Sequence, residues 1–415
     1  MSSGATVSVA AVKHWLVHQA LLATPMPRLA ARFADKLLAL GLPLWRAHVG
    51  ISTVHPQVES IGLTWTRQGK RQLEEFEHGS FARGANSSPF YEAVTAARAL
   101  ATAVREDSEE TIIPMTRFRL ERGEGWPSRP LLGEFHAAGG TDYVCFVIIF
   151  GVDGRLGPHS SGAAVSFTTD RPGGFTDDEI ATITDLLPTF GAAIRVGADL
   201  SKTRTLLETY LGRDVGQRVL SGEVRRGSVE AMSAAIVVGD LRGFTMLADE
   251  VPRDRLVSML DDYLDCLVGP VEASDGHVLK FLGDGLLATF AFDTREPQAV
   301  CVDALAAATA ALQRIEALNE QRQRDGQPIM TLDLALHAGE VLYGNVGSDR
   351  RLDFTIVGPA VNEAARLEAL CATLDVPLVA SRRFVDVLGA PEKFRSLGPR
   401  ALRGVRTPVE VFTTT

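Results

Sequence analysis

The apolar residues of this chain occur in short runs, and the length of those runs limits the folds open to it. The longest run, from Tyr143 to Gly151, holds about nine residues, whereas a helix that crosses a membrane needs about 20. Turn residues follow at once, which is typical of the end of a buried strand. No positively charged segment followed by an apolar stretch opens the sequence. We therefore expect a cytoplasmic protein without a membrane partner.

The charge balance and the cysteines exclude further classes. The 415 residues predict two or three domains at roughly 150 residues each. With 42 Lys and Arg against 51 Asp and Glu, the net charge is −9, which argues against a nucleic-acid partner. Hydrophobic residues (46%) and charged residues (22%) are typical of soluble globular proteins. The cysteines are far apart, with no CxxC pair, and we expect free thiols at Cys145, Cys266, Cys301 and Cys371.

The first half of the chain has the pattern of an α+β domain. Apolar residues recur at helical spacing in His14–Leu22 and Leu29–Leu40. Alternating or continuous apolar segments predict strands at Trp45–Val54, Ser60–Trp65, Tyr143–Phe150 and Ala163–Thr168. Thr176 with Glu179 three residues later forms a capping box, which begins a helix that continues to about Leu211. We predict a domain over residues 1–198 and a helical connector over 199–229.

The second half predicts another α+β domain, over residues 230–415. Its expected elements are a buried strand at Ala234–Val238, an amphipathic helix over Leu256–Leu267, two strands at Val278–Leu282 and Leu286–Phe290, an Ala-rich helix at Ala299–Asn319, a strand at Leu332–Leu336 and a helix at Val361–Leu370. Gly283–Asp284–Gly285 separates two of these strands, which indicates a hairpin.

Two carboxylates stand at turns of this second domain. Asp240 follows a predicted buried strand, and Asp284 lies at the tip of the predicted hairpin. Taken singly, an Asp at a turn is most often a turn or cap residue. Together with a Gly and a new helix start, however, the pair suits a phosphate held by backbone N–H groups and hard divalent cations held by carboxylates.

A second cluster spans Phe354–Arg366. Asn362 and Arg366 are four residues apart, so both side chains lie on the same face of the predicted helix. An isolated pair of this kind is ordinarily a solvated polar face. Here the neighbouring helical residues Val361, Ala364, Ala365 and Leu367 are apolar and a glycine turn precedes the helix, which favours an arginine directed toward a site.

Five motifs in this order are similar to those of the class III nucleotidyl cyclases, the adenylate and guanylate cyclase family. The resemblance covers roughly residues 230–415 and is specific because all five motifs occur together. They are Asp240–Thr245, Lys280–Gly285, His337–Val341 with Gly344–Gly347, Thr355–Arg366 and Leu402–Val405. The resemblance implies a catalytic domain with a ferredoxin-like core.

The resemblance also implies roles for individual residues. Asp240, Asp284 and the backbone carbonyl of Leu241 would bind two Mg²⁺ or Mn²⁺ ions. Arg366 would stabilise charge on the α-phosphoryl group, and Asn362 would orient the ribose.

The resemblance implies substrate-binding residues in two further segments. The first is the turn formed by Gly243, Phe244 and Thr245. Arg403 stands where the family usually has a Lys that contacts the terminal phosphates. Pro359 stands where the family commonly has Asp, and it makes the turn before Asn362 stiffer.

Lys280 and Thr355 occupy the two base-selecting positions of the family. Lys280 only donates hydrogen bonds, which suits the N1 acceptor of adenine and opposes the N1–H of guanine. The hydroxyl of Thr355 can accept from the adenine N6 group. ATP is therefore the expected substrate, and guanylate cyclase activity is the disfavoured alternative.

In the family, metal-binding and base-binding residues of one site come from two catalytic domains, so the resemblance implies a homodimer with shared sites. The end of the first half, Gly162–Ile194, resembles a GAF-like sensor domain, with a small-molecule ligand left open. The expected protein is thus a sensor-regulated adenylate cyclase that makes 3′,5′-cyclic AMP. A nucleotide-binding regulator without turnover is the alternative of a different class.

Overall fold

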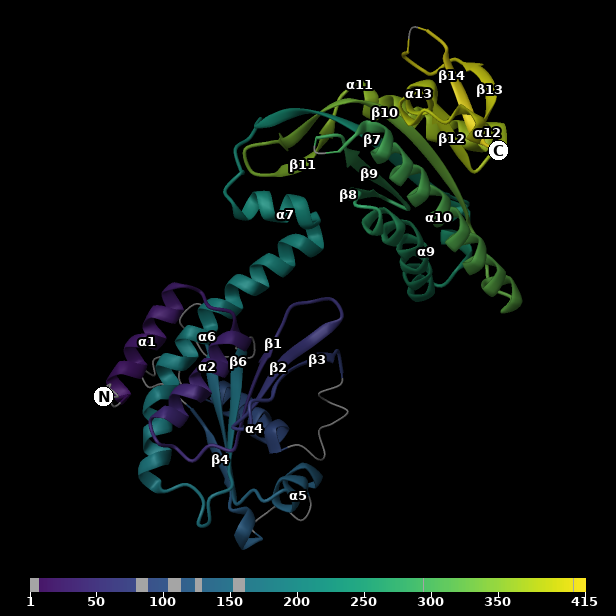
Figure 1. Cartoon of the computed structure of the whole chain (residues 1–415). Coiled ribbons are helices and arrows are strands. Elements are labelled where there is room, and N and C mark those ends of the chain that lie inside the picture. Colours follow the sequence, from purple (N-terminus) through teal and green to yellow (C-terminus); the bar gives the residue numbers. More distant parts are fainter. Residues whose placement is uncertain are drawn as a thin grey trace. The chain divides into compact units, whose positions relative to one another are not determined.

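The computed structural model describes residues 7–79, 89–103, 113–123, 129–151, 161–293, 295–405 and 407–415. They form two compact units, Met1–Leu206 and Leu207–Thr415, each built on one β-sheet covered by helices (Figure 1). All four cysteines are free, as expected. No helix within the described ranges is both long and apolar enough to cross a membrane.

The N-terminal unit contains a six-stranded antiparallel sheet in the order β3-β2-β1-β6-β5-β4. Its strands are β1 (Arg46–Ser52), β2 (Val58–Thr66), β3 (Arg71–Glu77), β4 (Met115–Phe118), β5 (Asp142–Phe150) and β6 (Ser161–Thr169). The four strands predicted from apolar patterning are confirmed as β1, β2, β5 and β6. Strands β3 and β4 were not predicted, because β3 is largely exposed and β4 is four residues long.

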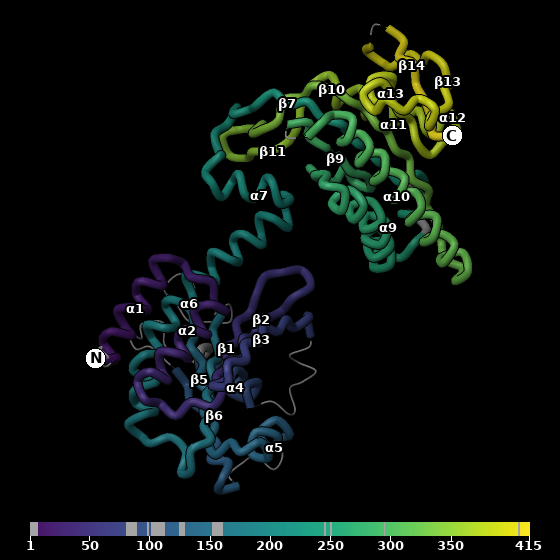
Figure 2. Tube along the Cα trace, viewed as in Figure 1, coloured from purple at the N-terminus to yellow at the C-terminus, as the bar shows by residue number. Residues whose placement is uncertain are grey.

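Helices cover both faces of this sheet (Figure 2). Helices α1 (Val9–Leu21), α2 (Met26–Ala39) and α6 (Asp177–Leu211) share one hydrophobic core with β1, β5 and β6. A smaller core lies under α4 (Pro89–Ala103), α5 (Pro130–Ala137) and the 3-10 turn η1 (Leu120–Arg122). The predicted helices at the start of the chain and before the connector are therefore confirmed.

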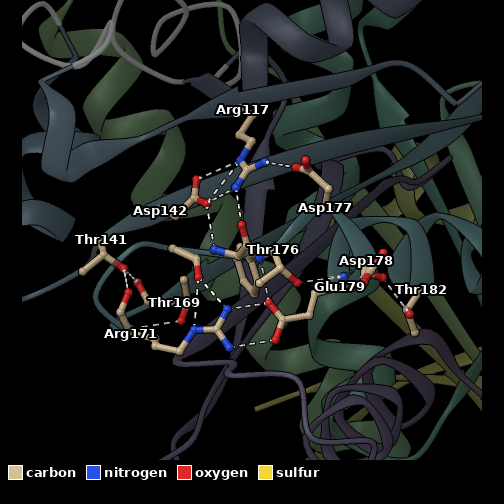
Figure 3. A network of polar contacts seen from close by, with 12 residues as sticks. Arg117, Thr141, Asp142, Thr169, Arg171, Thr176, Asp177, Asp178, Glu179 and Thr182 are labelled. Carbon is tan, nitrogen blue, oxygen red and sulfur yellow. Dashed lines mark hydrogen bonds and ion pairs between the residues drawn. The ribbon is translucent and has the colours of Figure 1, made fainter.

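The capping box predicted for α6 is present (Figure 3). The Thr176 backbone N–H donates to Glu179 Oε2 at 2.8 Å, and the Glu179 N–H donates to Thr176 Oγ1 at 3.2 Å. Arg171 adds an ion pair with Glu179 at 2.6 Å. These contacts satisfy N–H groups that the first turn of a helix leaves without partners.

A buried ion pair lies beside the start of α6 (Figure 3). Asp142, 1% exposed, accepts from Arg117 Nη2 at 2.7 Å and from the Phe175 backbone N–H at 3.0 Å. Arg117 also donates to the Phe175 carbonyl oxygen at 2.6 Å. One carboxylate and one guanidinium therefore connect β4 and β5 to the turn that leads into α6.

The C-terminal unit contains an eight-stranded sheet in the order β13-β14-β12-β10-β7-β9-β8, with β11 paired to β10. Its strands are β7 (Val229–Arg242), β8 (His277–Leu282), β9 (Gly285–Ala291), β10 (Thr331–Gly347), β11 (Leu352–Val357), β12 (Leu378–Ser381), β13 (Phe394–Arg400) and β14 (Val409–Thr414). The pairing of β10 with β12 is parallel, and the other pairings are antiparallel. The predicted hairpin of β8 and β9 is confirmed.

Both faces of this sheet are buried, which explains the continuous apolar run in β7. Helices α9 (Arg253–Ala273), α10 (Pro297–Arg324) and α13 (Arg382–Leu388) pack on one face. Helices α7 (Arg213–Leu220), α11 (Pro359–Glu368) and α12 (Leu370–Leu374) pack on the other. The shorter elements are α8 (Phe244–Glu250) and the 3-10 turn η2 (Pro391–Lys393).

Helix α7, from the predicted connector, packs within the C-terminal unit. The Tyr343 hydroxyl on β10 donates to Asp214 Oδ2 at 2.6 Å, and Arg218 pairs with Glu230 on β7 at 2.8 Å. The compact units divide between Leu206 and Leu207, inside α6. The predicted connector over residues 199–229 thus holds the end of one long helix and a second helix bound to the sheet.

Candidate active site

Asp240 and Asp284 lie near each other because β7 and β9 are neighbours. Asp240 lies two residues before the end of β7, Asp284 occupies the turn between β8 and β9, and the register pairs Gly239 with Leu286. Burial, followed by the charges of Asp284 and Asp333, raises the pKa of Asp240. Ionised Asp240 is therefore close to like charges, an arrangement that a bound cation relieves.

Gly285 permits this approach. A Cβ at Gly285 would lie 2.2 Å from the Gly239 carbonyl oxygen and 2.8 Å from Asp240 Oδ1, which no side chain tolerates. The backbone N–H of Leu241 donates a hydrogen bond to Asp240, which opposes the rise in its pKa. The hairpin tip, the end of β7 and Asp240 are thus packed against one another through backbone.

The turn after β7 begins a short helix. Gly243 is the N-cap of α8 with φ of 98°, a left-handed conformation that favours glycine, and Phe244 is the first helical residue. Thr245 belongs to α8, and its side chain lies outside the described residues. The predicted substrate-binding turn therefore has the strand–glycine–helix form that the sequence indicated.

Further acidic groups surround the carboxylate pair and were not predicted. Asp333 on β10 is 5% exposed and pairs with Arg242 at 2.6 Å. Burial, followed by the charge of Asp240, raises the pKa of Glu368 to about 7. Glu368 ends α11, so the helix that carries Asn362 and Arg366 reaches the electrostatic field of the carboxylates. Glu368 and Asp240 are far apart in sequence, so the sequence alone does not indicate that their charges interact.

The carboxylate pair fits a cation that is shared with a substrate. Within the described ranges, no group of three or more His, Cys, Asp and Glu side chains is arranged to hold a metal ion. Mg²⁺ is typically bound by one or two carboxylates, with phosphate oxygens and water completing its coordination. Asp240 and Asp284 match that pattern in number and in chemistry.

Helix α11 presents the polar residues predicted there. Pro359 occupies its first turn, where a missing N–H is tolerated, so this residue favours the helix start. Asn362 is exposed and Arg366 is half-buried. Neither side chain makes a hydrogen bond or ion pair with another residue of the described chain. Both are available to a ligand.

The predicted phosphate-binding turn lies against Arg366. A Cβ at Gly404 would be 3.5 Å from Arg366 Nη2, so the turn of Leu402 to Val405 contacts the guanidinium. Arg403 in this turn is exposed. The structure therefore brings two of the predicted anion-binding arginines into one neighbourhood.

The two predicted base-selecting residues lie on β8 and β11. Lys280 Nζ is 3.2 Å from Asp353 Oδ2, a partner that the sequence interpretation missed. Thr355, 4% exposed, has a buried hydroxyl without a hydrogen-bond partner among the described residues. Asp353 and Thr355 are two apart on one strand, a spacing that places alternate residues on one side and could have revealed Asp353.

The predicted metal-binding residues and the predicted nucleotide-binding residues make no direct polar contacts with each other among the described residues. Among the residues described, no hydrogen bond or ion pair connects Asp240 or Asp284 with Lys280, Asn362 or Arg366. The contacts described in a single copy therefore do not link the two predicted sets into one hydrogen-bonded site.

Comparison with known proteins identifies this region. Residues 228–413 match the family model of the adenylate and guanylate cyclase catalytic domain. Adenylate cyclase 1 of Rhizobium meliloti is 26% identical over 251 residues, covering 59% of this chain and 37% of that protein. The adenylate cyclase of Anabaena cylindrica is 27% identical over 227 residues, covering 52% and 44%. An uncharacterized protein of Mycobacterium tuberculosis is 34% identical over 217 residues, covering 51% and 38%.

This chain thus spans less than half the length of these curated relatives. Among solved structures, the adenylyl cyclase CyaB of P. aeruginosa is 24% identical, covering 45% of this chain and 96% of that one, with a TM-score of 0.41. The guanylyl cyclase Cya2 is also 24% identical, covering 45% and 93%, with a TM-score of 0.40. By the family match, the C-terminal unit carries a class III adenylyl/guanylyl cyclase catalytic domain at residues 228–413.

Proposed function

We propose that this protein is an adenylate cyclase, which converts ATP to 3′,5′-cyclic AMP and pyrophosphate. The observation that carries the proposal is the pair of neighbouring carboxylates, Asp240 and Asp284, in a domain where Asn362 and Arg366 have no hydrogen-bond or ion-pair partner among the described residues. Two relatives that cover about half of the chain are named adenylate cyclases.

The reaction forms a bond between the ribose 3′-oxygen and the α-phosphorus and breaks the bond from that phosphorus to the oxygen of the leaving pyrophosphate. The 3′-hydroxyl proton passes to solvent. Two divalent cations, Mg²⁺ or Mn²⁺, supply a lower pKa for the 3′-hydroxyl and neutralise phosphate charge when bound. Asp240, Asp284 and the Leu241 carbonyl are the groups that would hold them.

The remaining residues bind and orient the nucleotide. The Arg366 guanidinium donates to the α-phosphoryl oxygens as negative charge develops, an interaction whose removal typically costs about 10²–10³ in kcat. Asn362 orients the ribose, Arg403 contacts the terminal phosphates, and Gly243 to Thr245 offer backbone N–H groups to phosphate.

Base selection rests on Lys280 and Thr355. The Lys280 ammonium donates to adenine N1, and the buried Thr355 hydroxyl accepts from N6. Guanine would oppose its N1–H to the same ammonium, so we expect ATP to be preferred over GTP.

We further propose that the active form is a homodimer, in which each site takes the carboxylates from one copy and Lys280, Asn362 and Arg366 from the other. The lack of hydrogen bonds and ion pairs between the two sets among the described residues is consistent with this arrangement. The N-terminal unit is proposed to be a GAF-like sensor, since it combines an α+β layer structure with a long exit helix. Helix α6 would then transmit a conformational change of the N-terminal unit to the catalytic domain.

The first experiment measures turnover of ATP and of GTP by the purified chain with Mn²⁺ or Mg²⁺, following cyclic product and pyrophosphate. Cyclic AMP from ATP, with little product from GTP, is the expected result. Cyclic GMP from GTP as the main product would replace the proposal with a guanylate cyclase. Nucleotide binding without product from either the full chain or residues 200–415 would instead support a silent regulator.

Complementation tests the shared site. Asp240→Ala and Arg366→Ala should each abolish activity, and a mixture of the two purified variants should recover it, because each mixed dimer holds one intact site. Two variants that are dimeric by light scattering but fail to complement would contradict the homodimer proposal.

A further inference from the structure

Lys280 has an acidic partner on another strand of the same unit. Its Nζ on β8 lies 3.2 Å from Asp353 Oδ2 on β11, with side-chain exposures of 34% and 61%. In the described part of the chain, Asp353 is the single carboxylate within ion-pair distance of this ammonium. A pair this exposed adds about 0–1 kcal/mol to folding, so stability gives little reason for it.

The surroundings of the pair connect it with base recognition. Thr355 lies two residues after Asp353 on β11, and its buried hydroxyl has no partner within the described residues. Lys280, Asp353 and Thr355 therefore place a donor, an acceptor and an unpartnered hydroxyl close together. A lysine ammonium has three N–H donors, so one can remain on Asp353 while another meets a base.

Resting on the function proposed above, we propose that Asp353 is a positioning residue that fixes the Lys280 ammonium for purine selection. A lysine side chain has four flexible bonds and about 2 kcal/mol of rotamer entropy, and an unpaired ammonium at this exposure would spread over many conformations. The carboxylate of Asp353 limits those conformations before ATP arrives. One N–H of the ammonium is then directed at adenine N1.

Fixing the ammonium also strengthens rejection of guanine. A free Lys280 would turn toward solvent when guanine N1–H approaches, and the opposition of two donors would disappear. Held by Asp353, the ammonium stays in place and the opposition remains. Loss of Asp353 should therefore weaken ATP binding and at the same time reduce discrimination against GTP.

The test uses the full chain with Asp353→Ala, and Asp349→Ala as a matched control. Asp349 is an exposed carboxylate in the turn between β10 and β11, paired with Arg226. In Asp353→Ala we expect the KM for ATP to rise about three- to fivefold, kcat to change less than about twofold, and the ATP preference to fall about fivefold. Asp353→Glu should recover most of the ATP preference, and Asp349→Ala should match wild type.

A double-mutant cycle decides whether Asp353 acts through Lys280. Asp353→Ala should have no further effect when added to Lys280→Ala, because the group it positions is gone. An equal effect in both backgrounds, or an Asp353→Ala variant like Asp349→Ala, would overturn the inference.

Equilibrium binding of 3′-deoxy-ATP, which lacks the attacking hydroxyl, gives a readout without turnover. A chain that binds this analogue but forms no cyclic product from ATP or GTP refutes the cyclase proposal, and the same cycle measured by binding still decides the role of Asp353. A chain that neither binds nor turns over nucleotide refutes both.

Discussion

The two units of this protein treat their carboxylates differently. In the N-terminal unit, buried Asp142 is paired with Arg117 and accepts the Phe175 N–H. In the catalytic domain, Asp240 has Asp284 and Asp333 as its nearest charged influences, and both raise its pKa further. The first carboxylate completes its interactions within the fold. The second lies near like charges, which a bound cation would neutralise under the proposed function.

The difference separates a structural charge from a functional one. An internal ion pair with matched hydrogen bonds fixes a turn, here the turn before α6. A pair of like charges is retained against its own repulsion, which is typical of sites that bind cations or catalyse reactions. Substitutions at the two carboxylates should therefore have opposite consequences for stability and for activity.

The largest effect on stability is expected from Asp142→Asn. This change removes the buried carboxylate partner of Arg117, which then keeps only the exposed Asp177, at 3.6 Å, as an acidic partner among the described residues. Breaking a buried pair from one side typically costs about 3–5 kcal/mol. All four tryptophans of the chain lie in the N-terminal unit, so urea unfolding followed by Trp fluorescence reports on that unit. A loss below about 1 kcal/mol would mean that Asp142 is not a structural charge.

Asp240→Asn should show the reverse. Cyclase activity should fall by about 10² or more, because the neutral amide is a poor cation ligand. The free energy of unfolding should equal or exceed that of wild type, because the substitution removes repulsion with Asp284. Far-UV circular dichroism in urea measures the second quantity. A variant as destabilised as Asp142→Asn would abolish the distinction between the two carboxylates.

A buried histidine extends the comparison to pH. Burial, with a contribution from Arg383, lowers the pKa of His337 to about 4, and its Nδ1 lies 2.9 Å from Ser381 Oγ. In the unfolded chain the His337 imidazole binds a proton below about pH 6.5, whereas in the folded chain it binds one only below about pH 4. Stability therefore falls as pH decreases through this window, by about 2 kcal/mol at pH 5.

The matched variant is His337→Gln, which cannot titrate. Its stability should change less between pH 7 and pH 5 than that of wild type, as measured by urea unfolding of the catalytic domain. An unchanged pH dependence would assign the effect to other titrating groups of the catalytic domain.

The smallest effect is expected at an exposed pair. Lys13 and Asp185 are 2.6 Å apart with exposures of 39% and 54%, and Lys13→Ala should cost less than about 1 kcal/mol by Trp fluorescence. A cost comparable with that of Asp142→Asn would show that pairing alone, and not burial, determines the contribution of a charge in this unit.

Local patterns in the sequence predicted much of the fold. The Thr176–Glu179 capping box and the β8–β9 hairpin are confirmed because their contacts join residues close in sequence. The Arg117–Asp142 pair was not predicted, since it depends on the register of β4 against β5. That register comes from tertiary packing and not from a local pattern.

The candidate site was predicted to a different extent. The positions of Asp240 and Asp284 followed from motif order and hairpin geometry, and the structure places them together. The roles of Asn362, Arg366 and Arg403 stay predictions, because a site that needs a substrate and a second copy is incomplete in one chain. Asp353 was not predicted because a charged residue on a short strand is ordinarily a solvent-exposed residue without a specific partner.

Helix α6 has one further consequence. It is 35 residues long, and its buried residues end at Ala198. Beyond that point the helix keeps its backbone hydrogen bonds with little core packing, and helical segments shorter than about 12–15 residues are marginal by themselves in water. Amide hydrogens of residues 199–206 should therefore exchange with deuterium much faster than those of residues 183–198. One continuous helix thus contains a stable part and a part that opens readily, and the change occurs just before the boundary between the two units.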